Sequence, residues 1–91
     1  MATIAVWLKI DGERVAQALQ EVHSNLDNAE GEVVLDFSSV RRIDPDALRA
    51  MEELAESAEA KAVRLVLRGV NVNVYKVLKL VKLASRFSFL A

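Results

Sequence analysis

Near the start of the chain, the spacing of apolar residues changes from that of a strand to that of a helix. In residues 3–10 every second side chain belongs to one apolar set: Ile4, Val6, Leu8 and Ile10. This period of two predicts a strand with one buried face. After Asp11 and Gly12 the apolar residues recur at helical spacing opposite a polar side, at Val15, Ala18, Leu19, Val22 and Leu26. This spacing predicts an amphipathic helix.

A turn at Asn28 to Gly31 is predicted to lead into a second strand. Residues 32–37 contain the uninterrupted apolar run Val33 to Leu35, and such a run is typical of a central strand covered on both faces. The next helix has a clear start, because Asp44 can cap the free amides of the first turn and Pro45 fits the first helical position. Its buried stripe is predicted to contain Leu48, Met51, Leu54, Ala55 and Ala58.

The last third of the chain repeats the alternation. Val63 to Leu67 are predicted to form a third strand, and either Asn71 or Asn73 opens a third helix that runs to about Leu80. Alternating strands and helices with short links are typical of a parallel α/β sheet with right-handed crossovers. We therefore expect one α/β domain over residues 1–91, with a small, mainly parallel sheet of about four strands and helices packed on it.

Composition agrees with one folded domain that depends on packing alone. The chain is 53% apolar and 27% charged, so it has enough apolar surface for a core. Its 91 residues are too few for two separate cores. The absence of cysteine excludes disulfides and thiol chemistry. No long apolar run or basic leader is present, so we expect a soluble, cytoplasmic protein without membrane insertion.

The charges are unevenly distributed along the sequence. Residues 1–60 carry all thirteen acidic residues and five basic ones, whereas residues 61–91 carry seven basic residues and no acidic one. The basic segment either pairs with the acidic helices of the same fold or faces an acidic protein, a phosphate or a membrane surface. Nucleic-acid binding is not expected, because no aromatic residues interleave with the basic ones in a stacking pattern.

Few residues are available for catalysis. His23 is the single histidine, so a two-histidine metal site and a Ser-His-Asp triad both lack members, and the three isolated glycines form no phosphate-binding loop. Asp36, Asp44 and Asp46 are a possible Mg²⁺ set, but Asp44 and Asp46 have structural roles at a helix start. We expect no enzyme activity, no metal and no cofactor.

Three segments together resemble the STAS domain, the family of anti-sigma factor antagonists that also includes cytoplasmic tails of sulfate transporters and stressosome subunits. These segments are Val33-Val34-Leu35-Asp36-Phe37-Ser38-Ser39-Val40, Ile43-Asp44 opening a helix with Leu48, and Val63 to Val70 before a helix with Val77-Leu78. The resemblance covers residues 33–87 and implies a STAS fold whose loop-to-helix junction contacts a protein. The residues expected to contact the partner are Asp36, Ser38, Ser39, Arg41, Arg42, Asp44, Pro45, Asp46 and Leu48.

Regulated members of that family are phosphorylated on the hydroxyl residue that follows the aspartate at this junction. This chain has Asp44-Pro45-Asp46-Ala47 there, and Pro45 has no hydroxyl to phosphorylate. One interpretation is that the domain always remains able to bind, because the charge of a phosphate cannot be added. The other is that Asp46 imitates part of a phosphorylated state. We favour the first, since Asp46 is also explained by the helix dipole.

A second candidate patch lies near the C-terminus. Lys76, Lys79, Lys82 and Arg86 recur at intervals that would gather them on one side if the third helix continued, and Leu80, Leu83 and Phe87 would then also share a face. This apolar face is either covered by Phe89 and Leu90, which we favour, or forms a basic-rimmed patch for a homodimer or a partner.

The sequence therefore predicts a non-enzymatic, regulatory protein-binding module that acts without serine phosphorylation. Its partner would be an anti-sigma factor-like kinase or another component of a STAS system. The alternative is an accessory STAS subunit of a stressosome or of a lipid-transport ABC system, and a third hypothesis is a nucleotide or lipid phosphate held by the basic segment.

Overall fold

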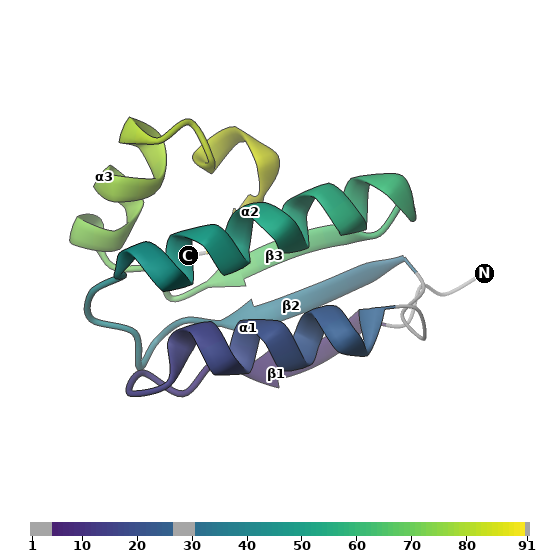
Figure 1. The fold of residues 1–91 in the computed structure, drawn as a ribbon, viewed down its shortest axis with the longest axis horizontal. Helices are drawn as coiled ribbons and strands as arrows, with labels where there is room; N and C mark the ends of the chain where they lie inside the picture. Colours follow the sequence, from purple (N-terminus) through teal and green to yellow (C-terminus); the bar gives the residue numbers. More distant parts are fainter. Residues whose placement is uncertain (1–4, 27–30, 91) are drawn as a thin grey trace.

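The computed structural model describes residues 5–26 and 31–90, which form four strands and three α-helices in alternation. The elements in chain order are β1 (Ala5–Lys9), α1 (Val15–Ser24), β2 (Glu32–Asp36), α2 (Pro45–Ala60), β3 (Arg64–Arg68), α3 (Val72–Leu80), the short 3₁₀ helix η2 (Ala84–Arg86) and β4 (Ser88–Leu90) (Figure 1). Ile4 and most of the turn predicted at 28–31 lie outside the described residues.

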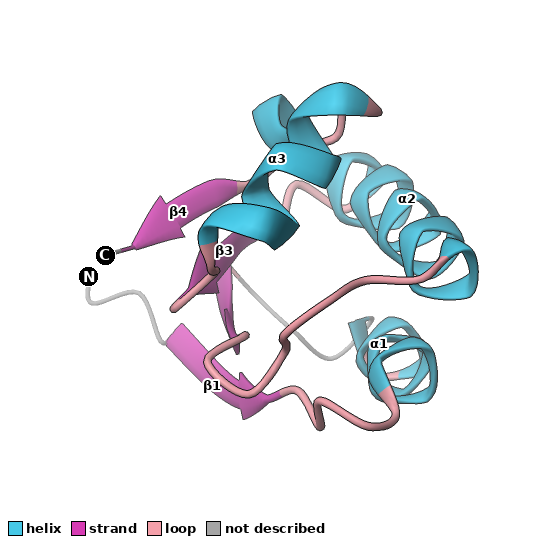
Figure 2. Ribbon diagram, turned by 90° about the vertical axis from the view of Figure 1, so that its left-hand side faces the viewer, coloured by secondary structure: helices cyan, strands magenta, loops and turns pink. Residues whose placement is uncertain are grey.

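The four strands form one sheet in the order β1-β2-β3-β4, and each neighbouring pair is parallel. This confirms the predicted α/β fold class. When consecutive parallel strands are added in one direction with crossovers of one hand, the connecting helices all lie on the same face of the sheet. Figure 2 shows this arrangement, with α1 and α2 side by side on one side of the strands.

The main core lies between that face and the helices. Val33 and Leu35 of β2 and Leu65 and Leu67 of β3 point into it, together with the buried stripes of the helices. Met51 and Leu54 of α2 and Leu19 of α1 are among its fully buried side chains. The sequence predicted these stripes from their helical spacing.

The opposite face of the sheet carries no helix within the described part of the chain (Figure 2). Val33, Val34 and Leu35 are all buried, which confirms the prediction of a central strand covered on both faces, but no described helix covers Val34. Val34 instead lies in a row with Trp7 and Val66, its partners in the sheet register. The rows on either side of it contain the Arg64–Glu32 and Arg68–Asp36 ion pairs.

Candidate functional site

Three loops meet at the carboxyl ends of the strands, the edge at which α/β sheets commonly bind ligands. The loop after β1 touches the loop after β2 so closely that a Cβ on Gly12 would lie 2.0 Å from the carbonyl oxygen of Ser39. The loop after β3 contributes Gly69, whose φ of 72° is in the left-handed region and whose added Cβ would lie 3.1 Å from the Ser38 Cβ. Only glycine allows both close approaches.

Asn71 holds the loop after β2 from a third side. Its Oδ1 accepts the Val74 amide at 2.8 Å, which caps α3, while its Nδ2 donates to the carbonyl oxygens of Val40 at 3.2 Å and Arg41 at 3.0 Å. The sequence left the start of α3 open between Asn71 and Asn73, and the structure selects Asn71. The capping role was visible in the sequence, but the contact with a loop thirty residues away has no sequence signal.

The loop after β2 ends at the start of α2, as predicted. Asp44 caps the helix by accepting the Ala47 amide at 2.8 Å, and Pro45 is the first helical residue. Asp44, Pro45 and Asp46 are all exposed, so this helix start faces solvent. Its surface therefore presents two carboxylates and a proline ring, with no hydroxyl among these three residues.

Four further predicted residues lie on the same exposed loop. Ser38, Ser39, Arg41 and Arg42 are exposed, and neither arginine forms an ion pair with any residue that the structure describes. Leu48 differs from them, because its side chain is half-buried against the core. The structure thus brings together most of the predicted contact residues, with Leu48 at their edge.

Asp36 stabilises the loop at the end of β2. Its Oδ1 accepts the Ser38 amide at 2.9 Å and lies 3.5 Å from Arg68 Nη1. The hydrogen bonds from the Ser38 amide and hydroxyl, followed by the positive charges of Arg68 and Lys9, hold the pKa of Asp36 below its ordinary value. Asp36 therefore acts first as a structural acceptor in this loop.

Neither of two other kinds of site is found among the described residues. In residues 5–26 and 31–90 no three His, Asp or Glu side chains lie close enough to hold a metal ion, so Asp36, Asp44 and Asp46 do not form the Mg²⁺ set that the sequence left open. No helix in the described ranges is long and apolar enough to cross a membrane.

Comparison with known proteins shows the family to which this chain belongs. Residues 3–90 match the protein family described as "Mlab, STAS domain", and this match covers nearly the whole chain. The chain belongs to this STAS family. No curated protein has a matching sequence.

Solved structures share the fold of this STAS domain at low sequence identity. The crystal structure of a candidate anti-sigma factor antagonist from Thermotoga maritima aligns with a TM-score of 0.75 at 19% identity, over 97% of this chain and 81% of that chain. A sulfate transporter family protein from Wolinella succinogenes aligns with a TM-score of 0.77 at 23% identity, over 98% and 80%. An NMR structure of the same T. maritima protein gives 0.77 at 20% identity, over 99% and 76%.

The second patch predicted for the STAS domain is divided by the fold. Helix α3 ends at Leu80 and does not continue, because Lys82 has a left-handed φ of 64°. Leu80 is therefore 81% exposed, while Leu83 and Phe87 turn inward and join the core. The apolar face that these three residues would have shared on a continuous helix does not exist.

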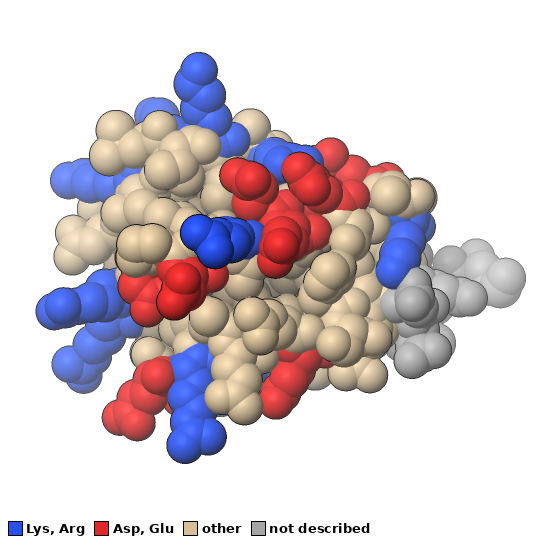
Figure 3. Space-filling model, viewed as in Figure 1, with Lys and Arg blue, Asp and Glu red and all other residues tan. Residues whose placement is uncertain are grey.

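The basic residues of that patch are divided in the same way. Arg86 leaves the group, since its Nε and Nη2 donate to the two carboxylate oxygens of Glu59 on α2 at 2.9 and 3.0 Å. Lys76, Lys79 and Lys82 stay exposed and form no ion pair with a described residue. Figure 3 shows acidic side chains gathered over α2 and basic ones at the end of the molecule where α3 and the loops lie.

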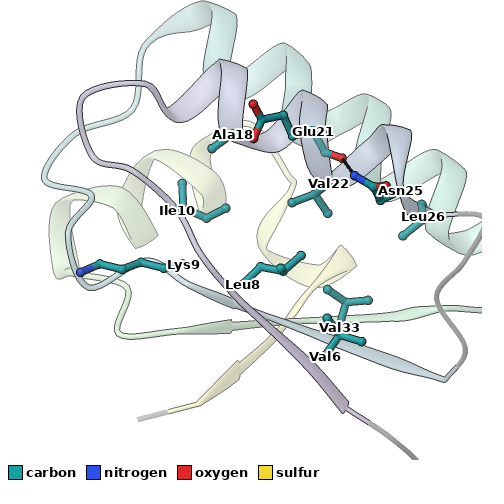
Figure 4. A pocket seen from close by; sticks show the side chains of 10 residues that line it. All are labelled: Val6, Leu8, Lys9, Ile10, Ala18, Glu21, Val22, Asn25, Leu26 and Val33. Carbon is teal, nitrogen blue, oxygen red and sulfur yellow. Dashed lines mark hydrogen bonds between the residues drawn. The ribbon is translucent and has the colours of Figure 1, made fainter.

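An apolar groove that the sequence did not predict lies between β1 and α1 (Figure 4). Its volume is about 360 Å³. Val6 and Leu8 line its strand side, and Ala18, Val22 and Leu26 line its helix side, with Glu21 and Asn25 also along α1. The groove is separate from the loop that carries the predicted contact residues.

Proposed function

We propose that this STAS domain is a non-enzymatic regulatory module that binds a cytoplasmic protein partner through the loop after β2 and the start of α2. The observation that carries the proposal is the exposed helix start at Asp44, Pro45 and Asp46, which no described element covers. The proposed contact surface consists of Ser38, Ser39, Arg41, Arg42, Asp44, Pro45 and Asp46, with Asp36 shaping the loop and Leu48 at the edge.

The contacts that hold this loop in place support a role in recognition. Gly12, Gly69 and Asn71 fix its backbone from three directions, and Asp44 fixes the helix that follows. A surface that is already ordered before binding loses little conformational entropy when a partner docks. The unpaired Arg41 and Arg42 would give an acidic partner favourable electrostatic contacts.

The chemistry of the helix start supports binding that phosphorylation does not switch. A phosphate at this position would add about −1.5 to −2 charge units at a fitted surface. Pro45 has no side-chain oxygen that could receive it. Asp46 supplies a single negative charge in the first turn of α2. A negative charge at this end stabilises a helix through its dipole, which explains Asp46 without a role in imitating a phosphate.

A binding assay tests the proposal directly. The purified protein is mixed with candidate kinase-type anti-sigma factors, with and without ATP, and both complex formation and phosphate incorporation are measured. We expect a complex that ATP does not dissociate and no phosphate in residues 38–47, which include the exposed Ser38 and Ser39. Phosphate in that segment would contradict the phosphorylation-independent part of the proposal, and the absence of a complex with every candidate would contradict the partner class.

Charge reversal locates the contact surface. Arg41→Glu combined with Arg42→Glu should weaken the complex at least about tenfold, because two positive charges at the interface become negative. The matched control is Lys79→Glu combined with Lys82→Glu, which makes the same double charge reversal at exposed residues at the end of α3 that form no ion pair with a described residue. Equal affinities of the two variants would place the interface elsewhere.

An accessory subunit of a transport system or a stressosome is the second candidate function. The match to the family described as "Mlab, STAS domain" and the similarity in fold to a sulfate transporter family protein favour it. Neighbouring genes for an ATPase and a permease would support transport, whereas a kinase and a phosphatase would support signalling. Co-purification with that ATPase, lost in the Arg41→Glu and Arg42→Glu variant, would assign the same surface to the transport role.

A further inference from the structure

Strand β1 is an edge strand with one unpaired side. Among the strands that the structure describes it pairs with β2 alone, and the amide of Ile10 just beyond it donates to the Asp36 carbonyl at 3.0 Å. Backbone N–H and C=O groups alternate between the two sides of a strand, so those of Val6 and Leu8 also point toward β2. The N–H and C=O groups of Ala5, Trp7 and Lys9 therefore point outward, where no described strand pairs with them.

In residues 5–26 and 31–90, nothing provides this edge with the features that usually prevent a strand from pairing with another chain. Natural edge strands are protected by several charges, a proline, a bulge or a covering element. In β1 the single charged residue is Lys9, which comes at its end, while Trp7 is 57% and Val6 39% exposed. The groove beside it adds a further apolar surface at the same edge (Figure 4).

We propose that β1 pairs antiparallel with β1 of a second copy of this chain, about a twofold axis that passes beside Trp7. In this register the Trp7 residues of the two copies lie opposite each other, and Lys9 of each lies opposite Ala5 of the other. All outward N–H and C=O groups of these three residues are then paired, because they form the hydrogen-bonded positions of an antiparallel ladder. An axis at Lys9 would instead place two like charges directly opposite each other.

The surrounding charges agree with this register. Ala5 is paired in the sheet with Glu32, so Lys9 of one copy approaches Glu32 of the other along the same row. Glu32 is available for such a contact, because its ion pair with Arg64 is long, at 3.9 Å. The self-pairing therefore gains a favourable charge contact on each side of the axis.

The apolar side chains also match. On the open face of the sheet the two Trp7 rings meet, each already beside its own Arg68 guanidinium at 5.9 Å. On the helix face Val6 of one copy lies opposite Leu8 of the other, so the mouths of the two grooves cover each other. The two four-stranded sheets join into one sheet of eight strands.

The association is measured on the wild-type chain by sedimentation velocity between about 1 μM and about 1 mM, a range that covers weak self-association. We expect a monomer–dimer equilibrium, with the emission of Trp7, the single tryptophan, shifting to shorter wavelength as the dimer forms. Amide hydrogen exchange gives the register, since the Trp7 and Lys9 amides should become protected with concentration while Leu8 is protected throughout. A monomer over the whole range, or a dimer without new protection at Trp7 and Lys9, would overturn the proposal.

A substitution at the axis provides the second test. Trp7→Lys places two like charges opposite each other and should raise the dimer dissociation constant at least about tenfold. The side chain is more than half exposed, so far-UV circular dichroism and cooperative urea unfolding should be retained. The matched control is Leu80→Lys, which changes an exposed apolar residue outside β1. A folded Trp7→Lys variant that dimerises like the wild type would contradict the β1 interface.

Discussion

At the scale of single residues, the start of α2 is defined by Asp44 and Pro45, which have different roles. The Asp44 carboxylate accepts an amide hydrogen bond, whereas Pro45 removes an amide that would otherwise need a partner. Both roles depend only on neighbours along the chain. This is why the sequence alone was enough to predict the start of this helix.

Replacement of Asp44 by alanine tests the cap. We expect Asp44→Ala to lower the free energy of unfolding by about 1 kcal/mol, because the Ala47 amide loses its acceptor. Urea unfolding followed by circular dichroism measures the change. The matched control, Asp46→Asn, removes a charge from the same turn without removing a cap and should cost only a few tenths of a kcal/mol. Equal losses for the two variants would contradict the assigned cap.

At the scale of elements, α3 ends at Leu80, as the sequence predicted, and both α2 and α3 end without a glycine. After α3, the Leu83 amide bonds to the Leu78 carbonyl at 2.8 Å and Lys82 has a φ of 64°. After α2, the Val63 amide bonds to the Ala58 carbonyl at 2.8 Å and Ala62 has a φ of 56°. Both are Schellman-type ends, which usually contain glycine. With alanine and lysine in the left-handed position, the sequence carried no glycine signal for this kind of helix end.

This observation predicts a stabilising substitution. Ala62→Gly should raise the free energy of unfolding by about 0.5–1 kcal/mol, because glycine adopts the left-handed conformation without the steric cost of a Cβ. Ala60→Gly, within the last turn of α2, should lower it by a similar amount. Thermal and urea unfolding of the two variants provide the comparison. Destabilisation by both changes would show that the end of α2 does not strain Ala62.

At the scale of the whole molecule, the charge asymmetry of the sequence has two outcomes. Arg64, Arg68 and Arg86 form ion pairs with acidic residues from the first 60 positions. Lys76 and Lys79 of α3, and Lys82 just after its end, form no ion pair with a described residue and stay on the surface. From the sequence, the basic residues of the last third either paired with acidic residues of the same fold or formed a free basic surface. The structure contains both arrangements.

The Arg86–Glu59 pair predicts a pH dependence of stability. The hydrogen bonds and charge of Arg86 hold the pKa of Glu59 below its ordinary value, so the folded protein binds fewer protons than the unfolded chain as the pH falls through this range. This contribution is therefore present above the ordinary pKa of a glutamate and is lost as the pH falls through the lowered one. Hydrogen bonds from Ser38 lower the pKa of Asp36 in the same direction.

Arg86→Gln tests this contribution. The variant should lose less stability than the wild type between about pH 6 and about pH 3.5, because its Glu59 returns to an ordinary pKa in the folded state. Arg86→Lys keeps the charge without the two-pronged hydrogen bond and should give an intermediate slope. Urea midpoints across this range provide the measurement, and identical slopes for all three proteins would contradict the assigned cause.

The sequence by itself determined the alternation of strands and helices, the buried stripes, the start of α2 and the absence of a hydroxyl at that start. These features depend on periodicity and on neighbours a few residues apart, which the sequence contains directly. The tertiary structure alone decided what depends on residues distant in the chain. Asn71 reaches the loop after β2, Gly12 lets two loops touch, Phe87 enters the core, and β1 lies at the edge of the sheet that the described strands form. Spacing along a chain does not encode such contacts, because they arise only when the sheet brings separate segments together.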